Sequence, residues 1–143
     1  MQEEIAEFIK ESKIATVCCV KEGLPHCFNC LYAYIPGIEG IVFKSSGTSL
    51  HSTMMQDEIP VAGTIYQSSK SGLDNTGIQF YGKAAISDEV MDAAEKAYYK
   101  RYPLALVVRG QLCAIVFDSI KFTKTTKGIR RKCTWEKEEL NKE

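Results

Sequence analysis

The sequence contains no hydrophobic run that approaches the roughly twenty residues of a membrane-spanning helix. It also lacks net charge, because 18 basic residues balance 18 acidic residues, so no overall field attracts nucleic acid or an anionic membrane. The first four residues are partly acidic, where a secretory signal would be basic. We therefore expect a cytoplasmic protein that acts on a small molecule, with no nucleic-acid or membrane partner.

Histidine is scarce, since His26 and His51 are the only two in the chain. Six cysteines are present, and in a cytoplasmic protein we expect reduced thiols. Cys27 and Cys30 have the spacing of a metal or redox motif, but residues three apart on a strand point to opposite faces and cannot hold one ion. We therefore predict no metal site, and cysteines that serve mainly as small buried hydrophobic residues.

A chain of 143 residues suits a single domain with one core, covering residues 1–143. Tight turns between the first strands favour a closed antiparallel barrel over a doubly wound sheet, so the predicted fold is mainly β with accessory helices. Apolar spacing predicts helices over residues 3–12 and 88–100 and a short helix entered through Ser49. Alternating or continuous apolar runs predict strands over residues 14–20, 26–35, 41–43, 61–66, 77–86 and 111–123.

The segment from Gly40 to residue 57 reads as strand, hydroxyl-rich loop and short helix. Thr48 or Ser49 can cap the helix, whose free amide groups and positive dipole end favour an anion such as phosphate. The alternative is a polar turn that contains only a helix cap.

Several motifs occur in a recognisable order along the chain. They are the strand end Phe43-Lys-Ser-Ser, the helix entered through Ser49, Pro60-Val-Ala-Gly-Thr, Gly77-Ile-Gln-Phe-Tyr-Gly82, and residues 120–128 followed by a basic run and Trp135. This order resembles the pyridoxamine 5′-phosphate oxidase-like FMN-binding split barrels, especially a poorly characterised bacterial branch. The resemblance implies a six-stranded antiparallel split β-barrel that forms a homodimer, with FMN sites at the subunit interface.

The resemblance also implies which residues bind FMN. The expected phosphate and ribityl contacts are Lys44, Ser45, Ser46, Ser49 and His51. Asn29 and Cys30 would lie along the flavin ring, and Gln79 would contact its edge. A separate prediction comes from the C-terminal basic cluster, which consists of Lys124, Lys127, Arg130, Arg131 and Lys132. One or two of its cations, such as Arg131, would reach the flavin phosphate or an anionic substrate, and Trp135 would cover the ring. The alternatives are solvated strand positions for Asn29 and Gln79, a core position for Cys30, and a solvated tail for the basic cluster.

One departure from the family pattern concerns charge. Many members carry arginine then lysine where this chain has Leu50-His51, so a permanent charge is replaced by a titratable one and flavin affinity is expected to fall above neutral pH. The predicted function is an FMN-dependent oxidoreductase that transfers hydride or electrons between a reduced nicotinamide and a small acceptor, with no catalytic side chain identified. The alternatives are a non-catalytic flavin, haem or small-anion binding protein, and a purely structural dimer.

Overall fold

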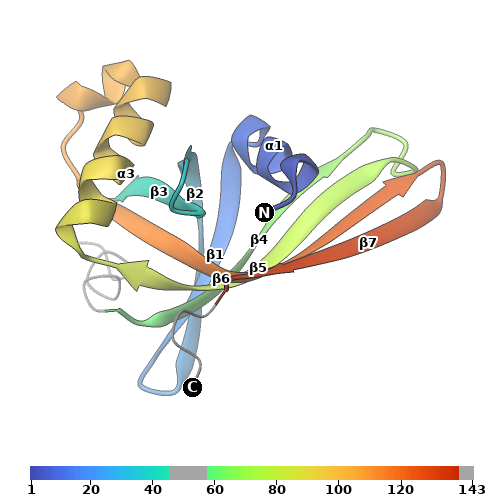
Figure 1. Ribbon diagram of the computed structural model, residues 1–143, viewed down its shortest axis with the longest axis horizontal. Coiled ribbons are helices and arrows are strands. Elements are labelled where there is room, and N and C mark those ends of the chain that lie inside the picture. The colour runs from blue at the N-terminus through green and yellow to red at the C-terminus, as the bar shows by residue number, and fades with distance from the viewer. Residues whose placement is uncertain (46–57, 139–143) are drawn as a thin grey trace.

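A computed structural model describes residues 1–45 and 58–138 of the chain. Figure 1 shows strands that curve around one core, with helices at the periphery. The helices are α1 (Glu3–Glu11), α3 (Asp88–Arg101) and the 3-10 helix η1 (Pro103–Val107). The strands are β1 (Ile14–Lys21), β2 (Leu24–Ile35), β3 (Gly40–Ser45), β4 (Pro60–Ser68), β5 (Asn75–Ala85), β6 (Gln111–Thr126) and β7 (Ile129–Glu136).

The strands form one antiparallel sheet in the order β3-β2-β1-β4-β5-β6-β7, and pairing of β3 with β6 closes the first six into a ring. The predicted six-stranded antiparallel barrel is therefore confirmed. Close approach at the β3–β6 seam requires glycine at position 40, because a Cβ there would lie 2.3 Å from the carbonyl oxygen of Ile115. The seventh strand, β7, pairs with β6 outside the ring.

Helix α1 covers the inward-facing core. Its residues Ile5 and Ile9 have no exposed surface and pack with aromatic side chains such as Phe43 and Phe80. The Tyr32 hydroxyl donates a hydrogen bond of 2.6 Å to the Ile9 carbonyl oxygen, which ties β2 to the helix. The amphipathic spacing of the N-terminal residues thus gives the helix that the sequence predicts.

Helix α3 covers part of the outer surface of the barrel. Ser87 caps its N-terminus, and Ala94 and Tyr98 pack on outward-facing residues of β2, β3 and β6, including Val42. At its C-terminal end, Arg101 donates hydrogen bonds to the carbonyl oxygens of Tyr32 and Ser12. Among the described elements, no helix packs on the outer surface formed by β1, β4, β5 and the adjoining part of β6.

The C-terminal basic cluster lies in a strand. A turn at Lys127-Gly128, where both residues have positive φ, returns the chain from β6 into β7. The cluster is therefore not a tail, although its cations are exposed to solvent as that alternative expects. Along β7, Arg130 and Lys132 project to one side of the sheet, and Arg131 lies on the other side with Cys133 and Trp135, which pack towards the core.

Candidate functional site

A row of polar side chains crosses the outer surface that α3 leaves uncovered, which we call the open face. Its members alternate along each strand with core residues such as Val17 and Phe80, because successive strand residues point to opposite faces. Thr16 Oγ1 lies 2.7 Å from Asn29 Oδ1 and donates a hydrogen bond to it. From β2 across β1, β4, β5, β6 and β7, the directly paired members of this polar row are Asn29, Thr16, Thr64, Gln79, Lys121 and Thr134.

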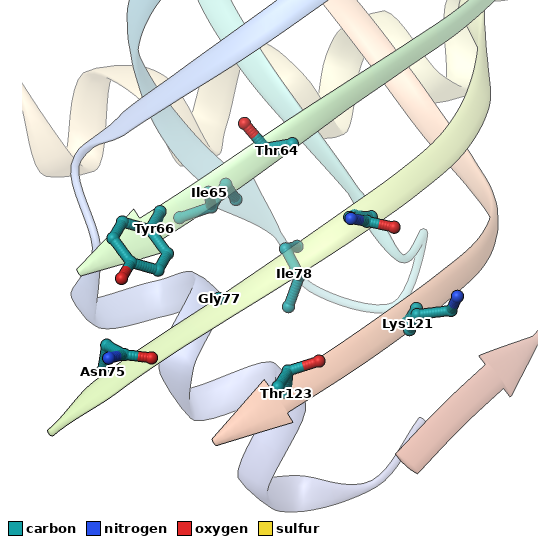
Figure 2. A pocket seen from close by; sticks show the side chains of 9 residues that line it. Thr64, Ile65, Tyr66, Asn75, Gly77, Ile78, Lys121 and Thr123 are labelled. Carbon is teal, nitrogen blue, oxygen red and sulfur yellow. The ribbon is translucent and has the colours of Figure 1, made fainter. Parts of the chain in front are cut away.

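A cleft of about 290 Å³ lies on this row, between β4, β5 and β6. Figure 2 shows Thr64 and Tyr66 of β4 and Lys121 of β6 around it, with β5 between the two strands. The absence of a side chain at Gly77 makes room for the Tyr66 ring, since a Cβ there would lie 2.9 Å from Tyr66 Cδ1. Tyr66 is 61% exposed, so its ring is available to a planar ligand.

A second cleft, of about 230 Å³, lies on the other side of Gln79 and Lys121, which line both. Tyr81 and Trp135 also line this cleft. Trp135 is half-buried and packs against the core, on the opposite side of β7 from Thr134, so Tyr81 is the aromatic side chain exposed on the open face here. Gln79 and Lys121 therefore present an amide and an ammonium group between two aromatic-bordered clefts.

Lys44, near the end of β3, is held in place by residues of α3 and η1. Its Nζ donates hydrogen bonds of 2.8 Å to the Tyr99 hydroxyl and to the Ala105 carbonyl oxygen, and lies 4.9 Å from the centre of the Tyr99 ring. Gly110 packs against the same strand end, because a Cβ there would lie 3.0 Å from Lys44 Cγ and 2.7 Å from the Ser45 carbonyl oxygen. The ammonium group has a third N–H for another acceptor.

The remaining predicted phosphate contacts follow Lys44 in sequence. Ser45 is buried, with its Oγ 3.7 Å from Cys113 Sγ. Ser46, Ser49 and His51, together with the predicted short helix, lie outside the described residues.

Two predicted ring and phosphate contacts lie away from the open face. Cys30 packs against the core, where burial, and then the neighbouring Cys113, raises the pKa of its thiol to about 12. Arg131 forms an ion pair with Glu4 of α1, and Lys124 Nζ lies 4.0 Å from the same carboxylate. The structure thus brings Asn29 and Gln79 into one row and Gln79 and Trp135 to one cleft, and it leaves Cys30 and Arg131 elsewhere.

Several residues of this site were missed by sequence reasoning. Thr64 and Lys121 sit at outward positions of predicted strands, but their alignment with Gln79 depends on strand register, which the sequence does not reveal. Tyr99 and Ala105 reach Lys44 from more than 50 residues away along the chain. The sequence gives one partial signal for this part of the site, because Gly110 directly precedes the strand predicted over residues 111–123 and glycine there indicates a turn.

Two further classes of feature are absent from residues 1–45 and 58–138. Searched over this part of the chain, the structure contains no group of three or more His, Cys, Asp or Glu residues that could hold a metal ion. Nor does any helix here have the length and apolar character needed to cross a membrane.

Solved structures share this architecture. They include an FAD-binding protein from Mesorhizobium loti, with a TM-score of 0.66, 10% identity, and coverage of 88% of this chain and 96% of that chain. An FAD and haem binding protein from Mycobacterium smegmatis has a TM-score of 0.67 and 16% identity, with coverage of 97% of this chain and 75% of that chain. A candidate pyridoxamine 5′-phosphate oxidase from Corynebacterium glutamicum has a TM-score of 0.58 and 12% identity, with coverage of 90% of this chain and 94% of that chain. The fold is that of the pyridoxamine 5′-phosphate oxidase-like split barrels, as the sequence resemblance predicts.

Proteins related in sequence identify the family of this chain. No family model matches the chain. The UPF0306 protein of Citrobacter koseri is 30% identical over 132 residues, which are 92% of this chain and 90% of that protein. UPF0306 protein YhbP of Salmonella paratyphi B has the same identity and coverage. The chain belongs to the UPF0306 family.

Proposed function

We propose that this protein binds FMN on its open face as a homodimer and acts as a flavin-dependent oxidoreductase. The observation that carries the proposal is the position of Gln79 and Lys121 between two clefts bordered by the exposed rings of Tyr66 and Tyr81. An amide and an ammonium group can hydrogen-bond the carbonyl and nitrogen acceptors along one edge of a flavin ring, while aromatic side chains contact its plane. The Mesorhizobium and Mycobacterium proteins described above bind FAD, which supports a flavin on this fold.

A second copy of the chain is the proposed cover for this surface. Ile14, Leu31 and Tyr81 lie on the open face and are each more than half exposed, which is unusual for a group of large apolar side chains on a monomer. The cleft of about 290 Å³ lies at the lower limit of typical ligand pockets, which measure roughly 300–1,000 Å³. A partner chain would bury the apolar side chains and enclose the cleft.

Lys44 lies beside α3 and not on the open face, so in the proposed homodimer, with each site built from both chains, it would serve the FMN phosphate. Hydrogen bonds to Tyr99 and Ala105 fix the ammonium group beside the strand end that leads into the hydroxyl-rich segment. One N–H of the ammonium group then remains for a phosphate oxygen. A single terminal phosphate matches FMN.

Bound FMN would supply hydride or electron transfer at its ring system. The residues of this chain would hold the phosphate, orient the ring edge and, once a second chain covers the open face, exclude water. The six members of the polar row include no carboxylate, imidazole or thiol. The lack of such groups in the polar row favours a second candidate function, a non-catalytic carrier of flavin, haem or a small anion. Absence of turnover would support this carrier.

The test is an FMN titration followed by fluorescence, with wild type, Lys121→Met and a matched control, Lys83→Met. Lys83 is exposed on the neighbouring strand β5 and lines neither cleft. Loss of one charge-assisted hydrogen bond, worth about 1.5–3 kcal/mol, should weaken binding roughly ten- to 150-fold in Lys121→Met. Equal affinities in the two variants would remove the open face as the flavin site.

Turnover separates the two candidate functions. The FMN-loaded protein should oxidise NADH or NADPH in the presence of a small acceptor such as a quinone if it is an oxidoreductase. Tightly bound flavin with no turnover across a panel of acceptors would instead support the carrier.

A further inference from the structure

Cys18 and Cys27 face each other across the β1–β2 hairpin, which projects from the lower end of the barrel in Figure 1. The Tyr32 amide donates to the Lys13 carbonyl oxygen at 3.0 Å, so this pair of residues is hydrogen-bonded. Hydrogen-bonded and non-hydrogen-bonded pairs alternate along antiparallel strands, which makes Cys18 and Cys27 a non-hydrogen-bonded pair. The next pair of that type contains Pro25, which has no N–H to donate, in agreement with this assignment.

The geometry of this pair suits a covalent link. Non-hydrogen-bonded partners have Cα atoms about 4.5 Å apart, within the roughly 4.4–6.8 Å found for disulfides. The two thiols are close enough for the Cys27 thiol to raise the pKa of the Cys18 thiol. Cys27 is exposed and Cys18 is half-buried, so a small reagent can reach the pair from solvent. Their sequence neighbours differ, because Cys19 is buried and Cys30 packs against the core.

We propose that Cys18 and Cys27 form a reversible cross-strand disulfide by exchange with a low-molecular-weight disulfide. The Cys27 sulfur attacks one sulfur of the reagent, forming a mixed disulfide, and the first thiol leaves with the proton from Cys27. The Cys18 sulfur then attacks the Cys27 sulfur, and the second thiol leaves with the proton from Cys18. The protein loses two electrons and two protons, and the reagent is reduced to two thiols.

The order of the two steps follows from the environments of the thiols. The hydrogen bond with Cys27, and then burial, raises the pKa of the Cys18 thiol to about 11. Cys18 is therefore the poorer nucleophile while Cys27 is reduced. Once Cys27 is in a mixed disulfide, its thiol is consumed, and the largest cause of the raised pKa of Cys18 is removed. Cys18 then acts as the resolving thiol.

This modification site is independent of flavin, since neither thiol lines either cleft. It is also distinct from the Cys27–Cys30 motif, whose two side chains lie on opposite faces of β2. The link would lie two residues along β1 from Thr16 and two along β2 from Asn29, so it would fix the strand pair at one end of the polar row.

The test is to incubate the folded wild-type chain with oxidised glutathione, alkylate the remaining thiols and digest with trypsin without reduction. Mass spectrometry should find the peptide of residues 14–21 linked to that of residues 22–44, with fragmentation placing the bond between Cys18 and Cys27. Dithiothreitol should reverse the link. The matched control Cys30→Ser should still form it, and Cys18→Ser should accumulate glutathione on Cys27.

Four outcomes would overturn the proposal. They are no linked peptide in folded wild type, a bond through Cys19 or Cys30, a bond between two copies of the chain, and an equal yield of glutathione on Cys27 in wild type and Cys18→Ser. Circular dichroism of each variant establishes that the protein tested is folded. Because Cys27 is exposed, Cys27→Ser should fold as wild type does, and it should leave Cys18 without glutathione.

Discussion

Replacing Lys44 by methionine tests whether its fixed ammonium group binds the flavin phosphate. The substitution keeps most of the aliphatic side chain and removes the charge. In the structure, two of the three ammonium N–H groups are taken by Tyr99 and Ala105 at 2.8 Å, so one remains for phosphate. One charge-assisted hydrogen bond contributes about 1.5–3 kcal/mol, which corresponds to a roughly ten- to 150-fold loss of FMN affinity.

Tyr99→Phe tests whether the anchoring of Lys44 matters. The phenylalanine ring preserves packing but removes the acceptor for one ammonium N–H, so Lys44 loses part of its fixed direction. We expect a smaller loss of affinity, below about tenfold, because the charge and the Ala105 contact remain. In the double variant, Tyr99→Phe should have no further effect, because Tyr99 acts through Lys44.

The assay is an FMN titration followed by flavin fluorescence, with Lys100→Met as the control for removal of an exposed lysine near the same helix end. Thermal unfolding monitored by circular dichroism checks that each variant is folded at the assay temperature. The reasoning is refuted if Lys44→Met and Lys100→Met bind FMN equally well. Additive effects of Lys44→Met and Tyr99→Phe would show that Tyr99 contributes by another route.

Two further predictions concern stability. In Gly63→Ala, the new Cβ would lie 2.3 Å from Phe80 Cζ and 2.4 Å from the Thr16 carbonyl oxygen, so the free energy of unfolding in urea should fall by about 1–3 kcal/mol or more. The control is Gly77→Ala, whose Cβ would lie 2.9 Å from the Tyr66 ring and 3.3 Å from the Ile65 carbonyl oxygen; an equal or larger fall in that variant would contradict the prediction. The Arg131 guanidinium lowers the pKa of Glu4, so the ion pair stabilises the folded state above the ordinary Glu pKa and is lost as the pH falls through the lowered value. Wild type and Glu4→Gln should therefore differ slightly in unfolding free energy at neutral pH and converge in acid, and a difference that persists in acid would exclude the carboxylate charge as its cause.

Local patterns predicted most of the secondary structure. The alternation in β1, β2, β4 and β5 and the amphipathic spacing of α1 and α3 depend on neighbours in sequence, and these elements lie within a few residues of their predicted bounds. Strand β7 was missed because its charged residues resemble a solvated tail when their pairing with β6 is unknown. Its hairpin turn at Lys127-Gly128 was the available signal.

The candidate site was less accessible to sequence reasoning, since it depends on register between distant strands. Gln79 was identified from the family resemblance, but its alignment with Thr64 and Lys121 arises only when the barrel closes. The same holds for Lys44, whose anchors come from α3 and η1. Long-range packing therefore decides which predicted polar residues share a surface.

The cysteine pair is a different case, because the sequence contained enough information to find it. Counting outward from the two-residue turn at Glu22-Gly23 pairs Lys21 with Leu24 and, three steps further, Cys18 with Cys27. The prediction that the cysteines are mainly buried is wrong for Cys27, which is exposed.

The most direct test of the central claim is the visible absorption spectrum of the purified protein after incubation with excess FMN and gel filtration coupled to light scattering. We predict retained flavin absorption in a species with twice the mass of the 143-residue chain, with one FMN per chain. Absence of retained flavin, together with an unchanged flavin fluorescence on titration without separation, would contradict the assignment of the open face as a flavin site.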